Sequence, residues 1–118
     1  MKYLCLIYGS DADWAAMPET EREAVYAAYR SFADDARSSG SLVDGAELQP
    51  PATATTVRVR GGELSVLDGP FAETKEQLGG YFVLECEGLD EALALASKIP
   101  AARHGAVEVR AACGGGSR

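Results

Sequence analysis

Two short apolar runs limit the fold of this chain more than any other feature of its sequence. Every residue from 3 to 8 is apolar, and residues 81–86 are apolar except for Glu85. Such runs are typical of β-strands that are covered on both faces and lie at the centre of a sheet. A helical pattern of apolar residues follows each run. The sequence therefore predicts two β-α units around two central strands.

The first helix is expected at residues 18–39, because its apolar residues fall on one stripe. That stripe consists of Val25, Ala28, Tyr29, Phe32 and Ala36. Thr20 and Glu23 have the spacing of a capping box, although Pro18 could equally be the first helical residue. Gly40 is placed to end this helix in the left-handed conformation.

The other elements outside the middle of the chain are shorter. A second helix is expected at residues 89–99, where Pro100 stops it. One helical turn is expected around Trp14 and another at residues 72–77. Two further strands are expected, at residues 42–47 and, along an edge of the sheet, at 107–110.

The segment between the two β-α units predicts a β-hairpin. Residues 55–60 are expected to form a strand in which Val57 and Val59 alternate with Arg58 and Arg60, so one face of the strand is exposed to solvent. Gly61 and Gly62 supply a two-residue turn in which positive φ carries no Cβ strain. Residues 63–67 form the returning strand.

The order β-α-β, hairpin, β-α-β predicts an α+β protein with a ferredoxin-like fold and an inserted β-hairpin. The first and third strands are central in that fold, as the two apolar runs require. Two helices cover only one face of such a sheet. We expect the sheet of a second subunit to cover the other face, which predicts a homodimer. The alternative is that the inserted hairpin folds back over that face.

Length and charge narrow the class of protein. With 118 residues the chain suits one domain, expected at residues 1–112 and followed by a disordered tail at 113–118. Its apolar content of 47% can bury a core, which argues against a disordered chain. The formal charge of −7 disfavours nucleic acid as a partner. The apolar run at residues 3–8 is too short to span a membrane or to form a signal-peptide core, so we expect a cytoplasmic protein without a membrane partner.

The cysteines and the histidine predict no metal site and no cofactor. Cys5 and Cys86 sit in apolar strands, where a thiol is buried and inert, and Cys113 lies near the end of the chain. Their spacing matches no metal or redox motif. His104 lacks partners at ligand spacing and is expected in an exposed loop.

Residues 68–76, Asp-Gly-Pro-Phe-Ala-Glu-Thr-Lys-Glu, and the Gln-Leu-Gly-Gly-Tyr that follows them resemble the signature of the DGPF branch of the YCII-related family. Stretches at 48–56 and 99–109 extend the resemblance to about residues 1–111. It implies a dimeric α+β barrel, in which two ferredoxin-like units pack sheet to sheet with a cleft in each. It also implies an association with extracytoplasmic-function sigma factors.

Some relatives in that wider family are small lyases, in which a His–Asp pair does acid–base work such as dehydrochlorination of an aromatic ring. Their histidine lies on the first helix, 11 residues before a glycine that matches Gly40. The corresponding residue here is Tyr29. The resemblance therefore does not carry the His–Asp mechanism over unchanged.

Asp68 and Tyr29 are the candidate catalytic residues. Asp68 ends a strand beside a Gly-Pro turn and could act as a general base, or it could bond its own backbone as a turn residue. Tyr29 could donate a hydrogen bond to a ligand, or it could be part of the core. The candidate ligand-binding residues are Gly69, Pro70, Phe71, Thr74, Lys75 and Tyr81.

Several of these and neighbouring residues have two interpretations, one as part of a ligand site and one as purely structural. Lys75 could bind an anionic ligand or be a solvated surface charge. Gly79 and Gly80 allow close approach of the backbone, either to a ligand or to the Pro70–Phe71 turn. Trp14 and Phe71 could each line a pocket for a planar ligand or seal an interface.

Two functions follow from these readings. One is a ligand-binding or regulatory module, in which the cleft binds a small-molecule ligand or a protein partner. The other is a lyase or isomerase with Asp68 as acid or base in a cleft beside the DGPF turn. A third possibility is that this turn only builds the dimer.

Overall fold

A four-stranded antiparallel sheet forms the body of the protein in the computed structural model, which describes residues 1–114. Its order is β2-β5-β1-β6. The strands are β1 (Lys2–Gly9), β2 (Leu42–Glu47), β5 (Gln77–Glu85) and β6 (Ala106–Ala111). The two apolar runs are the central strands β1 and β5, so the predicted ferredoxin-like order is confirmed. The tail expected at 113–118 falls mostly on residues outside the described part of the chain.

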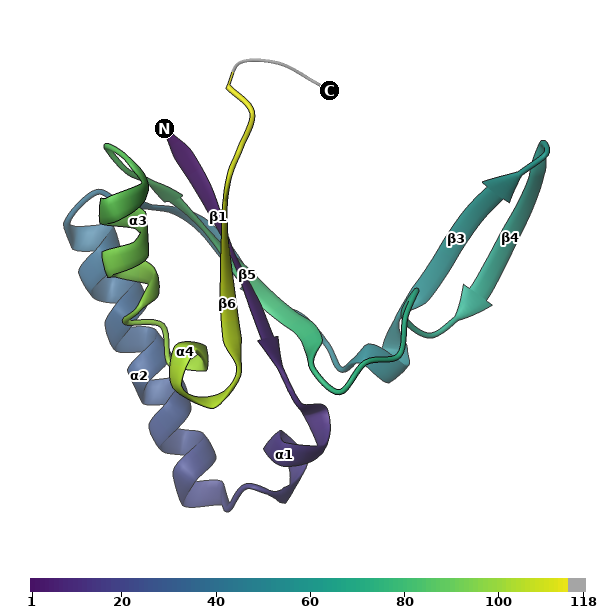
Figure 1. Ribbon diagram of the computed structural model, residues 1–118. Helices are drawn as coiled ribbons and strands as arrows, with labels where there is room; N and C mark the ends of the chain where they lie inside the picture. Colours follow the sequence, from purple (N-terminus) through teal and green to yellow (C-terminus); the bar gives the residue numbers. More distant parts are fainter. Residues whose placement is uncertain (115–118) are drawn as a thin grey trace.

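All the helices but the first pack on one face of this sheet, and the first lies beyond the end of β1 (Figure 1). The helices are α1 (Asp11–Ala16), α2 (Glu19–Ser38), α3 (Leu89–Ala96) and α4 (Ala101–His104). Strand and helix side chains share one buried cluster, which contains Tyr3, Cys5, Phe32, Ala36, Leu84, Cys86, Ala92, Ala96, Ile99 and Ala101. No helix among residues 1–114 is long and apolar enough to cross a membrane.

The opposite face of the sheet carries a second apolar surface. The β1–β5 register pairs Leu4 with Val83 and Leu6 with Tyr81 on this face. All four side chains remain partly exposed, whereas their neighbours on the helix face, such as Cys5 and Leu84, are fully buried. We call these four residues the open sheet face.

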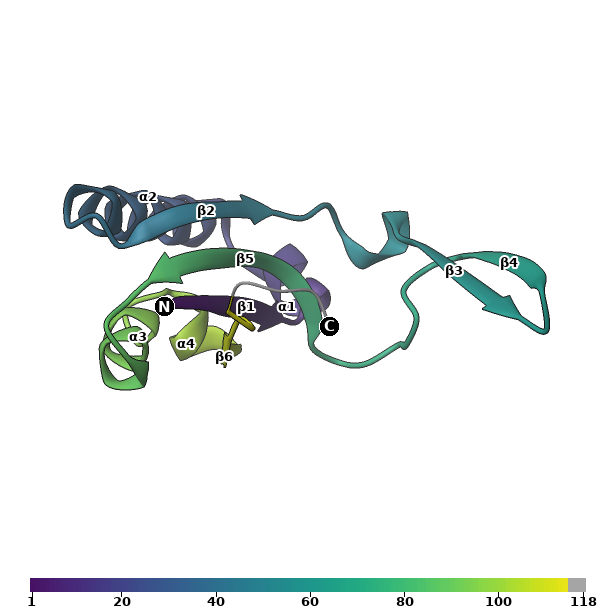
Figure 2. The same cartoon turned by 90° about the horizontal axis from the view of Figure 1, so that it is seen from above.

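The predicted hairpin is confirmed and forms a separate two-stranded sheet of β3 (Thr55–Arg60) and β4 (Glu63–Asp68). Gly61 and Gly62 take φ values of 57° and 80°, as a type I′ turn requires. The hairpin extends away from the sheet and does not fold over its open face (Figures 1 and 2). The radius of gyration of 16.1 Å exceeds the value of about 13.5 Å expected for a compact chain of this length. We call residues 55–68 the arm.

The start of α2 differs from the prediction. Pro18 is the N-cap, with no side-chain hydrogen bond at this end, and the helix begins at Glu19. Thr20 lies inside the helix, so the capping-box prediction is wrong. Pro18 precedes the first helical residue instead of being that residue. Gly40 has a φ of 79° and follows the C-cap, as predicted.

The helical turn predicted at residues 72–77 is wrong. Gln77 is the first residue of β5. Its side-chain amide binds the backbone of the preceding loop and keeps that loop out of a helical conformation. Nε2 donates hydrogen bonds to the carbonyl oxygens of Ala72 (3.0 Å) and Thr74 (3.1 Å). These bonds satisfy carbonyl groups that a helix would have paired.

Gly79 and Gly80 lie within β5 and do not precede it. A Cβ on Gly80 would stand 2.8 Å from the carbonyl oxygen of Ala46 on the neighbouring strand β2. The close approach that the sequence suggested is therefore made to β2, not to the Pro70–Phe71 turn. Further along, α3 ends at Ala96, three residues earlier than expected, and Pro100 caps the short helix α4.

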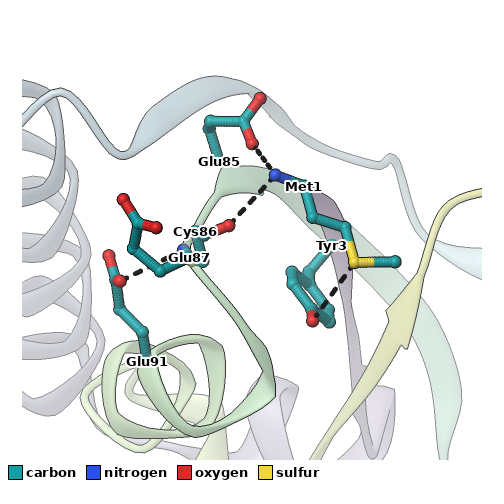
Figure 3. A network of polar contacts seen from close by, with 6 residues as sticks. All are labelled: Met1, Tyr3, Glu85, Cys86, Glu87 and Glu91. Atoms are coloured by element: carbon teal, nitrogen blue, oxygen red, sulfur yellow. Dashed lines mark hydrogen bonds and ion pairs between the residues drawn. The ribbon is translucent and has the colours of Figure 1, made fainter. Parts of the chain in front are cut away.

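The start of the chain is fixed to the end of β5 (Figure 3). The Met1 ammonium group contacts the Glu85 carboxylate and donates a 3.0 Å hydrogen bond to the carbonyl oxygen of Cys86. The Tyr3 hydroxyl donates to the Met1 sulfur at 3.6 Å. These contacts order the first residues of β1 beside the buried core.

Candidate functional site

A cavity of about 650 Å³ lies at the end of the body where β1 leads into α1. Its lining comes from the end of β1, from α1, α2, β2 and β5, from the Pro50–Pro51 segment and from the end of α4. Its size is that of ordinary small-molecule sites. We call it the α1–α2 cavity.

Aromatic side chains form two of its walls. Trp14 of α1 and Tyr26 of α2 meet edge to face, with ring centroids 5.3 Å apart and an interplanar angle of 89°. Tyr29 stacks on Phe82 of β5 with centroids 6.4 Å apart. Ser10 caps α1, because its Oγ accepts a 3.1 Å hydrogen bond from the Asp13 amide. The cap places Trp14 one turn later, on the cavity side.

Two phenol groups at the cavity are held in their protonated form. The Tyr26 hydroxyl donates a 2.9 Å hydrogen bond to Oε2 of Glu47, and this bond raises the pKa of Tyr26. Burial raises the pKa of Tyr29, against a smaller opposing effect of the Ala101 backbone N–H. Both groups are therefore neutral near pH 7, where Tyr29 can donate a hydrogen bond to a ligand.

The charged lining residues have an acidic surplus. The carboxylates are those of Asp11, Asp13, Asp44 and Glu47, whereas the guanidinium groups are those of Arg30 and Arg37. An excess of carboxylates repels anions. The cavity therefore suits an uncharged ligand better than an anionic one.

Tyr29 and Tyr81 are the predicted site residues that line this cavity, together with Trp14, Gly79 and Gly80. Tyr81 belongs to the β5 wall, but its side chain lies on the open sheet face beside Leu6. Tyr29, one of the two candidate catalytic residues, is thus at the site. His104 is exposed as predicted, but it ends α4 and lines the cavity.

The other predicted residues lie outside the lining, at the base of the arm. They are Asp68, Gly69, Pro70, Phe71, Thr74 and Lys75. Asp68 is the exposed last residue of β4, opposite Thr55. Within the described residues its carboxylate makes no hydrogen bond or ion pair. Phe71 has 80% of its surface exposed. The structure therefore does not bring Asp68 and Tyr29 into one cavity.

Backbone and side-chain hydrogen bonds hold this second region together. The Gly69 amide donates to the Ala54 carbonyl oxygen, and the Thr56 hydroxyl donates to the Gly69 carbonyl oxygen, both at 2.7 Å. Gly69 has a φ of 101°, a conformation that favours glycine. The Thr74 hydroxyl donates to the Glu76 carbonyl oxygen. The motif thus closes the base of the arm.

Tyr26 and Glu47 were missed as site residues. Tyr26 lies three residues before Tyr29, so helical spacing alone could have placed both on one face. Glu47 ends an edge strand and pairs with Gly80, a register that the sequence did not reveal. In residues 1–114, no group of three or more His, Cys, Asp or Glu side chains is arranged to hold a metal ion.

A solved structure is similar to this fold. It is 5-chloro-2-hydroxyhydroquinone dehydrochlorinase from Burkholderia phenoliruptrix AC1100, in complex with 2,5-dihydroxybenzoquinone. The similarity has a TM-score of 0.58 and covers 98% of this chain and 96% of that one. The sequence identity of 15% is low, so this likeness shows the fold alone.

The sequence itself is similar to that of an uncharacterized protein of Rhizobium meliloti (strain 1021). The two are 38% identical over 112 residues, which cover 93% of this chain and 90% of the relative. The YCII-related domain matches residues 1–113, nearly the whole chain. The protein therefore belongs to the YCII-related family.

Proposed function

We propose that this protein binds a small, planar, uncharged metabolite in the α1–α2 cavity. The observation that carries the proposal is a cavity of about 650 Å³ walled by two aromatic pairs, Trp14–Tyr26 and Tyr29–Phe82. Offset and edge-on aromatic contacts favour a flat ring as the occupant. The structural neighbour is in complex with a flat, oxygen-substituted six-membered ring, which supports a planar ligand, while the preference for an uncharged one rests on the acidic lining.

The proposed role is regulatory, and the position of the arm supports it. Pro50 and Pro51 on one connection to the arm line the cavity, as do Gln77 and Leu78 on the other. A ligand that contacts these residues can therefore favour one arm position over another. We place this role in the cytoplasm, beside an extracytoplasmic-function sigma factor, the association implied by the resemblance of residues 68–76 to the DGPF branch.

The alternative of a lyase or isomerase with Asp68 as acid or base receives less support from the geometry. Asp68 does not line the cavity, and a general base must come within hydrogen-bond reach of the proton that it removes. Because the structural neighbour is a dehydrochlorinase, we also test whether this protein catalyses a reaction. Incubation of a bound ring compound with the protein, followed by chromatography, distinguishes the two functions because a binding module returns it unchanged.

Isothermal titration with catechol, hydroquinone and 2-hydroxybenzoate tests the proposal. We expect the two neutral phenols to bind about tenfold more tightly than the carboxylate, because of the acidic lining. Ala33→Phe adds a ring to the cavity and should abolish binding. Ala27→Phe adds the same ring to an exposed position of α2 outside the lining and should leave binding unchanged. Equal effects of the two variants, or no binding by any of the three compounds, would argue against the proposal.

A further inference from the structure

One face of the arm is apolar and lies in water. The cross-strand pairs Val57–Val66 and Val59–Leu64 share this face. Their exposed fractions are 60% and 57% for the first pair and 59% and 68% for the second. We call these four residues the arm face. An isolated two-stranded hairpin is at best marginally stable in water, so the arm needs a covering surface.

No segment of residues 1–114 covers the arm face. Among the described strands, β3 and β4 pair with each other and with no third strand, and the arm extends away from the body in both views (Figures 1 and 2). Its base is fixed by the hydrogen bonds of Gly69 with Ala54 and Thr56. A third bond, from the Leu48 amide to the Gly79 carbonyl oxygen (2.9 Å), joins its two connections at β5. These bonds set the direction of the arm.

We propose that the arm face docks on a second copy of this chain, in a symmetric pair in which each copy covers the arm of the other. In a two-fold pair the same contact occurs twice, so both arms are covered at once. The open sheet face, with Leu4, Leu6, Tyr81 and Val83, is a second apolar surface that such a pair can bury.

The area of the arm face fits this occupant. Four side chains with these exposed fractions present on the order of 400 Å² of apolar surface, the size of the largest patch on a typical monomer, which is often a functional surface. Two arms and the two surfaces that they cover then amount to about 1,600 Å², the size of a standard stable interface. Two reciprocal arms therefore suffice for a stable pair.

Sedimentation equilibrium of the full chain and of two adjacent variants tests the proposal. Val66→Lys places a charge on the arm face, whereas Ser65→Lys places the same charge on the opposite face of β4. We expect a pair for the wild type, a dissociation constant raised about tenfold or more by Val66→Lys, and a change within about twofold for Ser65→Lys. Both positions lie outside the buried cluster, so circular dichroism should show an intact fold for both variants.

Amide hydrogen exchange of the wild type gives a second readout that needs no variant. We expect the arm amides to exchange slowly at concentrations where the pair forms and faster on dilution. A monomer at all concentrations would overturn the proposal, whether its arm amides are protected or not. A pair that Val66→Lys leaves intact would overturn it as well, because the arm would then lie outside the interface.

Discussion

The hydroxyl of Tyr26 on α2 donates a 2.9 Å hydrogen bond to the carboxylate of Glu47 at the end of β2. Both residues line the α1–α2 cavity, so the bond joins a helix to an edge strand at the site. It also connects the Trp14–Tyr26 aromatic pair to the strand that leads into the arm. The Tyr26–Glu47 hydrogen bond thus belongs to the cavity wall and also holds the end of β2, from which the chain continues to the arm.

The tyrosine pKa values predict how stability depends on pH. The pKa of Tyr29 is raised by burial and that of Tyr26 by the bond to Glu47, so the folded protein holds both protons to a higher pH than the unfolded chain. The stability that they contribute is complete below the unfolded pKa of about 10 and is lost as pH rises through the folded value. We expect the free energy of unfolding to fall above pH 10, and to fall less in Tyr29→Phe. Urea unfolding at pH 9 to 11 measures this, and equal slopes would contradict it.

Adjacent glycines of β5 should respond differently to alanine. A Cβ on Gly80 meets the Ala46 carbonyl oxygen at 2.8 Å, whereas the nearest atom to a Cβ on Gly79 is the Ile7 carbonyl oxygen at 3.9 Å. Gly80→Ala should therefore lower the free energy of unfolding by about 1–3 kcal/mol through overpacking. Gly79→Ala is the matched control and should change it by less than about 1 kcal/mol. Chemical denaturation checks both, and a larger loss for Gly79→Ala would refute the β2–β5 geometry.

The three cysteines should differ in reactivity. Cys5 is fully buried, and burial raises its pKa to about 11, while burial also raises the pKa of Cys86. Cys113 is exposed. Because the thiolate is the reactive form, brief treatment with iodoacetamide at pH 8 should label Cys113 alone, and all three in urea. Mass spectrometry counts the labels, and prompt double labelling of the native protein would show that the core is open.

Asp68→Asn should leave stability within about 0.5 kcal/mol, because the exposed carboxylate has no partner within the described residues. The affinity of the cavity for phenols should be unchanged as well. Thermal unfolding and calorimetry measure the two quantities. A loss of binding would return Asp68 to the site and favour the acid–base alternative.

The sheet and the arm were predictable because their signals are local. The apolar runs identify β1 and β5, and Gly61-Gly62 between alternating strands identifies the hairpin. The loop at residues 72–77 was not predictable, because the side chain of Gln77 decides it through contacts that helix propensity does not contain.

The candidate site was predicted in part. Tyr29, Tyr81 and Trp14 line the cavity, but the position of Glu47 depends on the β2–β5 register. The sequence predicted the site beside the DGPF motif, because a Gly-Pro turn commonly borders a cleft. In the structure the same turn closes the base of the arm instead.

Two-dimensional NMR of the labelled protein with catechol tests most directly whether the α1–α2 cavity is a small-molecule site. We expect the largest shifts at the indole N–H of Trp14, the single tryptophan, and at the amides of Gly79 and Gly80. The amides of Gly61 and Phe71 should shift little. Shifts confined to residues 69–76, or none at saturating catechol, would contradict the assignment of the α1–α2 cavity as the ligand site.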